Sequence, residues 1–334
     1  MRRTRSEHLW VASLAIACAL TFWAARASAF CRSYTCQADS TCDYDEHGCP
    51  VGGVPTVWHR SCITFSVQED GSPRWHVTAD EAAQILEQAY GSWTDASCED
   101  GTPSIQVFRL DPVSCNRAQV NLCDHNASIW MFHDDVWPYE DDDLTIALTW
   151  THFNPDSGEI LDTDVEVNTA QHAITTDPKG AGAQFVAIAT HEIGHIFGLA
   201  HSPSINATMY ANYRRTNDMS QLSIDDIQGI CTLYPPDRAA GPCVPEPLNG
   251  FASDCGTERC DPEGCCSTAP GGNGESSGGA LLVVGLGLLL GWRRRSGQRR
   301  SNLLACPTTN ADVNASGAAG LEAFAAVPRE AQDE

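Results

Sequence analysis

Three histidines near the middle of the chain have the spacing to bind one metal ion. They lie in residues 191–201, which read HEIGHIFGLAH. Helical residues i and i+4 lie one turn apart on the same face, so His191 and His195 can present two imidazoles to one tetrahedral zinc ion. Gly198 can take a positive φ angle and turn the chain sharply, and this turn brings His201 to the same ion. The fourth position is left for water.

Glu192 follows the first histidine and can lean over the metal from the same helix. Zinc lowers the pKa of its bound water to about 7, and Glu192 would accept the proton as general base. The hydroxide would attack a peptide carbonyl, and Glu192 would pass the proton to the departing amine. The pattern therefore predicts peptide-bond hydrolysis with one catalytic zinc ion. A site that binds zinc without catalysis is the alternative, although it would not need Glu192.

The composition bounds the size of the domain and the class of partner. The chain has 334 residues, enough for one domain of ordinary size with appended segments. It has 43 acidic against 20 basic residues and a formal charge of -23, which argues against nucleic acid as a partner. Acidic residues gather at 134–135 and 141–143. We interpret them as solvated loop acids, because calcium needs several converging oxygens; calcium stays open as a second metal.

The first residues have the order of a secretory signal peptide. Basic residues precede an apolar run at 9–25, and Ala27-Ser28-Ala29 supplies the small residues of a cleavage site. We predict cleavage after Ala29 and an exported chain, extracellular or at the cell surface. An uncleaved signal anchor is the alternative.

Sixteen cysteines in an exported chain indicate disulfides. When Cys18, Cys306 and the pair at 265–266 are set aside, an even set remains: Cys31, Cys36, Cys42, Cys49, Cys62, Cys98, Cys115, Cys123, Cys231, Cys243, Cys255 and Cys260. This set can be fully paired, although spacing does not give the connectivity. A zinc knuckle formed by the first four is the rival interpretation.

Hydrophobic periodicity predicts several strands and three helices around the histidine motif. Alternating or β-branched runs predict strands at 62–67, 104–110, 127–132, 144–150 and 160–167. Apolar residues at helical spacing predict a helix that opens at Thr78, with Ala82, Ile85, Leu86, Ala89 and Trp93 on one face. A second helix is predicted over 182–197, where Gly198 stops it, and a short third one over 222–230, with Ser223 as N-cap and Asp226 at the capping-box position.

The C-terminal part departs from this globular pattern. Residues 280–300 combine an apolar stretch, too short for an ordinary membrane span, with a cluster of arginines. A weakly held anchor and a removable sorting signal are the two interpretations. The expected organisation is a signal peptide at 1–29, a Cys-rich segment at 30–61, a catalytic domain at 62–236, a Cys-rich segment at 237–266, a Gly/Ser linker at 267–279, the sorting signal or anchor at 280–300 and a disordered tail at 301–334.

The histidine motif resembles that of the metzincin metalloproteases, and further residues resemble the matrixin branch. Ser202 follows the third histidine as in matrixins, residues 207–210 (ATMY) are similar to their Met-turn, and 222–230 to their final helix. The resemblance covers about 62–234. It implies an α+β fold with a twisted mixed sheet, a long N-terminal helix and an active-site helix, here flanked by small disulfide-rich segments. It also implies that Met209 lies beneath the zinc as a support and that Gly198 supports the turn.

The same resemblance implies a zinc-dependent endopeptidase, secreted or attached to the surface, that acts as a monomer on protein or peptide substrates. Residues 146–150 resemble the edge strand that pairs with an extended substrate. Cys265-Cys266 and the segment at 280–300 resemble the C-terminal sorting signals of myxobacterial surface proteins, which implies a bacterial protein with possible membrane or cell-surface attachment.

Some features of the family pattern are missing. Ala211 stands where astacins and serralysins have a tyrosine and matrixins a proline. There is no pro-segment cysteine switch, since Gly48-Cys49-Pro50 is only superficially similar, and residues 152–172 do not reproduce the structural zinc ligands. We therefore predict one zinc ion. A binding module on an inactive protease fold and a hydrolase of non-peptide amides are the competing functions.

Overall fold

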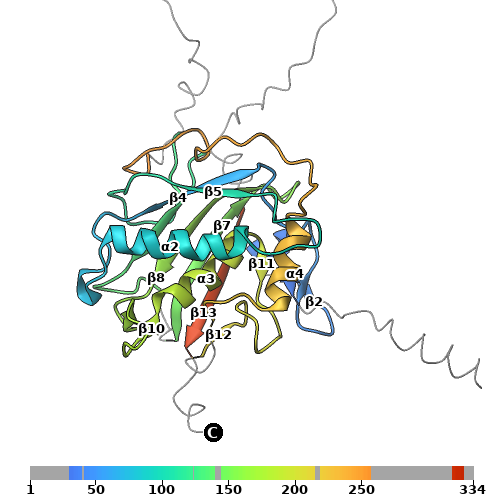
Figure 1. Cartoon of the computed structure of the whole chain (residues 1–334). Coiled ribbons are helices and arrows are strands. Elements are labelled where there is room, and N and C mark those ends of the chain that lie inside the picture. Colours follow the sequence, from blue (N-terminus) through green and yellow to red (C-terminus); the bar gives the residue numbers. More distant parts are fainter. Residues whose placement is uncertain are drawn as a thin grey trace, which may run out of the picture.

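A computed structural model describes residues 30–39, 41–122, 124–139, 144–214 and 219–256, together with the backbone of 318–326 (Figure 1). The segments predicted as signal peptide (1–29), linker (267–279) and sorting signal or anchor (280–300) lie outside these residues. No helix in the described part is long and apolar enough to cross a membrane.

The centre of the fold is a mixed sheet in the order β12-β13-β7-β8-β6-β4-β5. Five of its strands match those predicted from the alternating runs: β4 (Cys62–Val67), β5 (Gln106–Arg109), β6 (Ile129–Phe132), β7 (Thr145–Phe153) and β8 (Ile160–Val167). β5, β4, β6 and β8 run parallel to one another, whereas β7 is antiparallel to β8. The predicted α+β fold with a mixed sheet is confirmed.

Helices α2 (Ala79–Thr94) and α3 (Phe185–Ile196) cover one face of this sheet (Figure 1). The Thr78 side chain caps α2 by accepting a hydrogen bond from the Glu81 amide at 3.2 Å. The predicted apolar face of α2 is buried, and its Trp93 indole donates to the Thr190 carbonyl of α3 at 2.9 Å. This contact fixes the distance between the two helices.

Helix α3 begins later than predicted. Residues 182–184 were expected to be helical, but β10 (Ala183–Gln184) pairs with β9 (Ile174–Thr175) instead, so the helix starts at Phe185. The end of α3 is held by two buried donors, because the Trp58 indole donates to the Ile196 carbonyl at 2.8 Å and the Tyr234 hydroxyl to the Phe197 carbonyl at 2.8 Å. These bonds satisfy carbonyls that a helix end leaves without partners.

Helix α4 (Ile224–Leu233) closes the domain. It begins and ends slightly later than the predicted 222–230. Ser223 and Asp226 form the predicted capping box. The α4 residue Cys231 is joined to Cys98, just after α2, so the two helices are also connected covalently.

Disulfides join most of the cysteines expected to pair. The bonds in the described part are Cys31–Cys49, Cys36–Cys42, Cys62–Cys243, Cys98–Cys231 and Cys115–Cys255. The first two exclude the rival zinc knuckle, because its four thiols are bonded to one another. Cys62–Cys243 spans 181 residues. In the chain-entropy account a loop of at least 100 residues makes such a bond worth about 4–5 kcal/mol.

The N-terminal Cys-rich segment packs against the loop that follows α3. It comprises β1 (Cys31–Arg32), the 3-10 helix η1 (Thr35–Asp39), β2 (Asp43–Tyr44) and β3 (Pro50–Val51). β1 pairs antiparallel with β11 (Leu199–Ala200). A second 3-10 helix, η2 (Pro73–Trp75), precedes α2.

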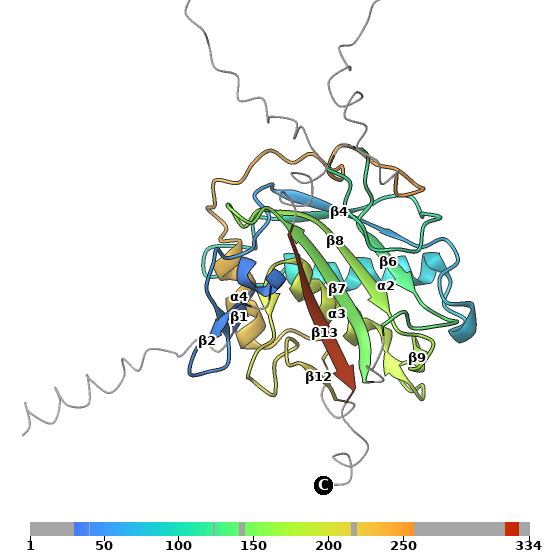
Figure 2. The same ribbon diagram turned by 180° about the vertical axis from the view of Figure 1, so that it is seen from behind.

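Part of the tail at 301–334 differs from the expectation of disorder, and its other residues lie outside the described part of the chain. Residues 318–326 form a strand, β13 (Ala318–Ala326), which lies between β7 and β12 (Asn212–Tyr213) (Figure 2). The reason is not local, because the strand gains its hydrogen bonds from the edge of β7, which lies far away in the sequence.

Candidate metal centre

Helix α3 places His191 and His195 side by side. Their Nε2 atoms are 3.1 Å apart, and both residues are buried. The His201 ring lies 5.3 Å from the His191 ring and 4.8 Å from the His195 ring, centroid to centroid. In the described part of the chain, this is the one group of at least three His, Cys, Asp or Glu residues whose ligand atoms all lie within 4.8 Å of one another.

Gly198 makes the turn that returns His201 to the cluster. Its φ angle is +94°, and a Cβ atom there would lie 2.5 Å from the Thr56 carbonyl oxygen. A residue with a side chain would therefore be strained in backbone conformation and would also clash. After this turn, β11 pairs with β1, which fixes the path toward His201.

Two backbone carbonyls set the tautomers of the histidines. His191 Nδ1 lies 2.6 Å from the Thr208 oxygen, and His195 Nδ1 lies 2.8 Å from the Leu199 oxygen. A carbonyl can only accept, so each Nδ1 carries the proton and each Nε2 keeps its lone pair. Both lone pairs are then available to one cation, which is the usual outer-shell support of metal-binding histidines.

The environment also keeps the imidazoles neutral. Burial, followed by the mutual effect of the neighbouring rings, holds the pKa of His191 and of His195 well below the ordinary value of 6.5. Burial lowers the pKa of His201 to about 4. Neutral imidazole is the form that binds zinc. Two buried imidazoles and a half-buried one, all neutral, therefore fit a tetrahedral zinc ion with one open position.

Glu192 is fully buried beside this cluster. Its Oε2 accepts a hydrogen bond from the Thr149 hydroxyl of β7 at 2.5 Å. The carboxylate is thus held between α3 and β7. This strand is the edge of the five-stranded part of the sheet, which we define as β7-β8-β6-β4-β5. Thr149 was not among the predicted site residues. The alternation along β7 was the one sequence signal that could have placed its side chain on the face of the sheet that contacts α3.

Met209 packs under the helix that carries two of the histidines. A Cβ atom added to Gly194 would lie 2.1 Å from the Met209 sulfur, so glycine is needed there for the thioether to approach the helix backbone. The turn is held by Asp226, whose carboxylate accepts from the Thr208 and Met209 amides at 2.8 and 3.1 Å. The structure thus adds Gly194 and a second role of Asp226 to the predicted set.

Comparison with known proteins agrees with this geometry. The matrixin family of peptidases matches residues 57–235. The chain belongs to the matrixin family. Like the named relatives below, this family indicates a zinc metalloendopeptidase, as the sequence resemblance implied.

The matrixin relatives share only part of their length with this chain. It is 25% identical over 184 residues to metalloendoproteinase 1-MMP of Arabidopsis thaliana, a match that covers 54% of this chain and 45% of the relative. It is 29% identical over 199 residues to matrilysin of Mus musculus, covering 55% and 66%. A shorter match of 63 residues to interstitial collagenase of Equus caballus reaches 49% identity and covers 18% and 13%. The chain therefore spans less than two thirds of each of these relatives.

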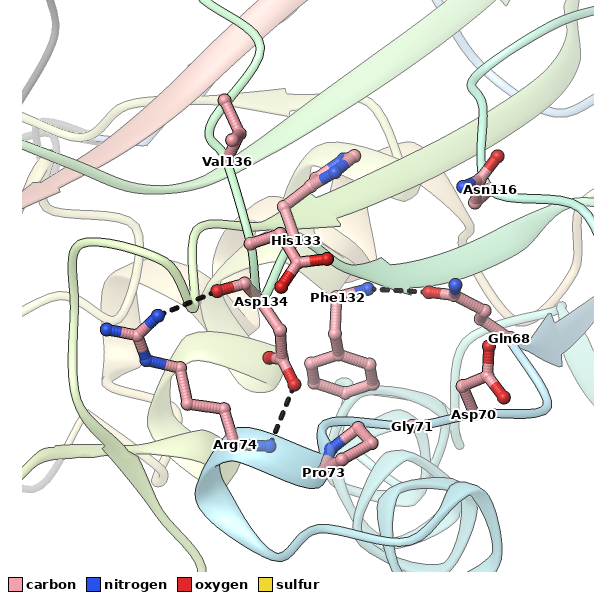
Figure 3. Close-up of a pocket in the computed structure, with 11 residues that line it drawn as sticks. Gln68, Asp70, Gly71, Pro73, Arg74, Asn116, Phe132, His133, Asp134 and Val136 are labelled. Carbon is pink, nitrogen blue, oxygen red and sulfur yellow. Dashed lines mark hydrogen bonds between the residues drawn. The ribbon is translucent and has the colours of Figure 1, made fainter.

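This matrixin also has an acidic pocket at the end of β6 whose lining includes none of the zinc-site residues (Figure 3). The Asp134 carboxylate accepts from the Ser72 hydroxyl at 2.6 Å and from the Arg74 amide at 2.8 Å, and the Asp134 carbonyl accepts from the Arg74 guanidinium at 2.8 Å. These bonds connect the end of β6 to η2. They give Asp134 a structural role, whereas 141–143 lie outside the described residues.

Proposed function

We propose that this matrixin is an exported, zinc-dependent endopeptidase that hydrolyses peptide bonds in extended protein segments. The observation that carries the proposal is the position of Glu192, a buried carboxylate beside three neutral imidazoles and bonded to the edge strand. A site that only stores zinc would have no use for a carboxylate held in this way.

The residues of the site divide the work of hydrolysis. His191, His195 and His201 would hold the metal through their unprotonated nitrogens, and the Met209 turn and the Gly198 turn would support them. Zinc, when bound, supplies a Lewis acid that polarises the carbonyl and brings the pKa of a bound water to about 7. The Glu192 carboxylate would accept a proton from the attacking water and return it to the leaving amine. Thr149 keeps the carboxylate oriented for both transfers.

The substrate would bind as an added strand. β7 is the edge of the five-stranded part of the sheet, and an extended peptide can pair with such an edge through backbone hydrogen bonds. Pairing of this kind does not depend on side-chain identity, so proteins and peptides are the expected substrates. Export rests on the signal-like residues 1–29 and on the disulfides, which belong to oxidising compartments. Attachment through the C-terminus, a monomeric state and a calcium ion stay predictions from the sequence.

The measurement that tests this function is zinc content together with casein hydrolysis. We expect one zinc per chain for the full-length protein. Glu192→Ala should retain the zinc and abolish hydrolysis, both in the full-length chain, whose activity is low, and in the variants with a free cleft described below. Glu87→Ala is the matched control, because Glu87 is exposed on α2 away from the cluster. Its zinc content and its activity should equal those of the unchanged chain.

The alternative is a surface-displayed binding module on an inactive protease fold. It predicts bound zinc without hydrolysis of casein in any variant, including those with a free cleft described below. A hydrolase of non-peptide amides predicts turnover of small amides with casein left intact. Either result would replace the endopeptidase proposal.

A further inference from the structure

The outer edge of β7 is already occupied by part of the same chain. β13 pairs with β7 antiparallel, in a register that runs from Ala318 opposite Phe153 to Ala325 opposite Thr145, with a shift after Phe324. The other edge of β7 pairs with β8. Both edges of β7 are therefore used along most of its length, as Figure 2 shows for the strand order.

β13 passes beside the candidate catalytic residues. Glu322 of β13 is in register with Thr149, and the Thr149 side chain donates to Glu192. The backbone of β13 therefore lies level with the general base. It occupies the position beside residues 146–150 where an extended substrate is expected to pair.

The far side of β13 is covered as well. β12, which follows the Met209 turn, pairs parallel with the end of β13, with Asn212 opposite Ala325 and Tyr213 opposite Ala326. The strand thus lies between the edge strand and the segment after the turn. An occupant held on both sides fills the groove between β7 and β12 as a bound peptide would.

From this arrangement we infer that residues 318–326 are an internal occupant of the substrate groove that keeps the enzyme latent. The inference rests on the proposed function. A peptide that adds to β7 needs the same N–H and C=O groups that β13 uses, so only one of the two strands can be present. Substrate access then requires that β13 leaves.

A tethered strand is an effective competitor. Roughly 60 residues connect Gly256 to Ala318, and an extended chain of that length could span about 200 Å, so the tether does not restrict docking. A tether of this length gives an effective concentration on the order of a millimolar, which exceeds that of most free substrates. Latency should accordingly be independent of protein concentration. A cut within 257–317 would convert the tethered strand into a dilute free peptide and activate the enzyme.

The N-terminal segment provides no competing device of the cysteine type. Cys49, in the Gly48-Cys49-Pro50 segment, is bonded to Cys31 and has no thiol to offer a metal. Processing of a removable sorting signal at 280–300, one of the two interpretations of that segment, would in contrast remove β13 from the chain. The enzyme would then be exported in the latent form and activated at the surface by that cleavage.

The test uses the full-length chain with single prolines in β13. Proline removes a backbone donor and is disfavoured within a sheet. Antiparallel ladders alternate between hydrogen-bonded and non-bonded pairs, so Glu322→Pro and Ala323→Pro together ensure that one of them removes a ladder bond. Ala331→Pro, in the same tail but beyond β13, is the control. Zinc content and circular dichroism verify that the domain is intact in each variant.

Two readouts separate this inference from the proposed function. Hydrogen exchange reports on the amides of β7, which should be protected in the unchanged chain and in Ala331→Pro and exposed in at least one β13 variant. Hydrolysis of an extended peptide should rise about tenfold in the variant that exposes β7. A β7 edge that exchanges freely in the unchanged chain, or equal and measurable activity in all variants, would overturn the inference alone. An exposed, zinc-loaded site with no activity in any variant would overturn the endopeptidase proposal, and the inference with it.

A synthetic peptide tests the same groove in trans. The peptide AAGLEAFAA, which is residues 318–326, should inhibit the activated variant with an inhibition constant of about 0.1 mM, a tenth of the effective concentration of the tethered strand, by raising KM with kcat unchanged. The peptide with proline at the position of Ala323 is its control and should inhibit less. Activity of the unchanged chain that rises on dilution would overturn the intramolecular assignment, because it would show that the strand is exchanged between copies.

Discussion

At the scale of single residues, backbone carbonyls orient two of the candidate zinc ligands. The carbonyls of Thr208 and Leu199 fix the tautomers of His191 and His195. The spacing of the motif predicted which histidines converge, because i and i+4 positions share a helix face. It could not predict the carbonyls, since every residue has one and only the folded path decides which of them faces a ring.

The hydrogen bond from Thr149 to Glu192 gives a prediction at this scale. Thr149→Val removes the donor and keeps the shape of the side chain. A hydrogen bond to a charged group contributes about 1.5–3 kcal/mol, so kcat should fall at least about tenfold. Steady-state kinetics of the activated β13 variant measures this effect.

Thr151→Val is the matched control for this change. Thr151 lies two positions further along β7, on the same face of the strand, and is also buried. Its replacement should leave kcat where it was. If Thr149→Val left kcat unchanged with zinc bound, Thr149 would be a packing residue only.

At the scale of elements, α3 depends on a close approach between its backbone and the turn that carries Met209. Gly194→Ala would place a methyl group 2.1 Å from the Met209 sulfur, and Met209 is itself buried. Overpacking of this kind costs about 1–3 kcal/mol. We expect a lower free energy of unfolding in urea and weaker zinc retention, because a shift of the turn also moves the Thr208 carbonyl away from His191.

Gly91→Ala isolates the effect of packing from that of helix propensity. Gly91 lies inside α2, and a Cβ atom added there has no atom within 4 Å. Alanine should stabilise this helix by about 0.5–1 kcal/mol relative to glycine. Equal destabilisation by both substitutions would contradict the assigned role of Gly194.

The elements that the sequence predicted well are those specified by local rules. The Ser223 and Asp226 capping box and the apolar face of α2 are read from neighbouring residues, and the structure contains both. The missing parts are nonlocal. Nothing near Cys62 names Cys243 as its partner, and nothing in residues 318–326 names β7, because a sheet ladder is formed by backbone groups that all residues share.

At the scale of the whole molecule, two buried carboxyl groups on β8 make the stability of the folded protein depend on pH. Asp162 is fully buried, burial raises its pKa from 3.8 to about 7, and its Oδ2 has no hydrogen-bond partner among the described residues. Burial, followed by the charge of Asp162, also raises the pKa of Asp164 on the same strand. Two buried carboxyls on one strand therefore favour the protonated form of the folded protein.

The sign of the pH effect follows from proton uptake. Between pH 4 and pH 7 the folded protein retains a proton on Asp162 that the unfolded chain has lost, so stability falls as pH rises through this window. Each pKa unit corresponds to about 1.4 kcal/mol, which makes the loss on the order of a few kcal/mol by pH 8.

Asp162→Asn cannot ionise and should therefore avoid this loss of stability. We subtract the melting temperature of the unchanged chain from that of this variant at each pH. This difference should be several degrees more positive at pH 8 than at pH 5. Asp156→Asn, at an exposed turn, should show no such difference between the two pH values. If Asp162→Asn lowered the melting temperature equally at both pH values, Asp162 would retain no extra proton in the folded protein, and its contribution to the stability of the sheet would come from its hydrogen bond with Ser128.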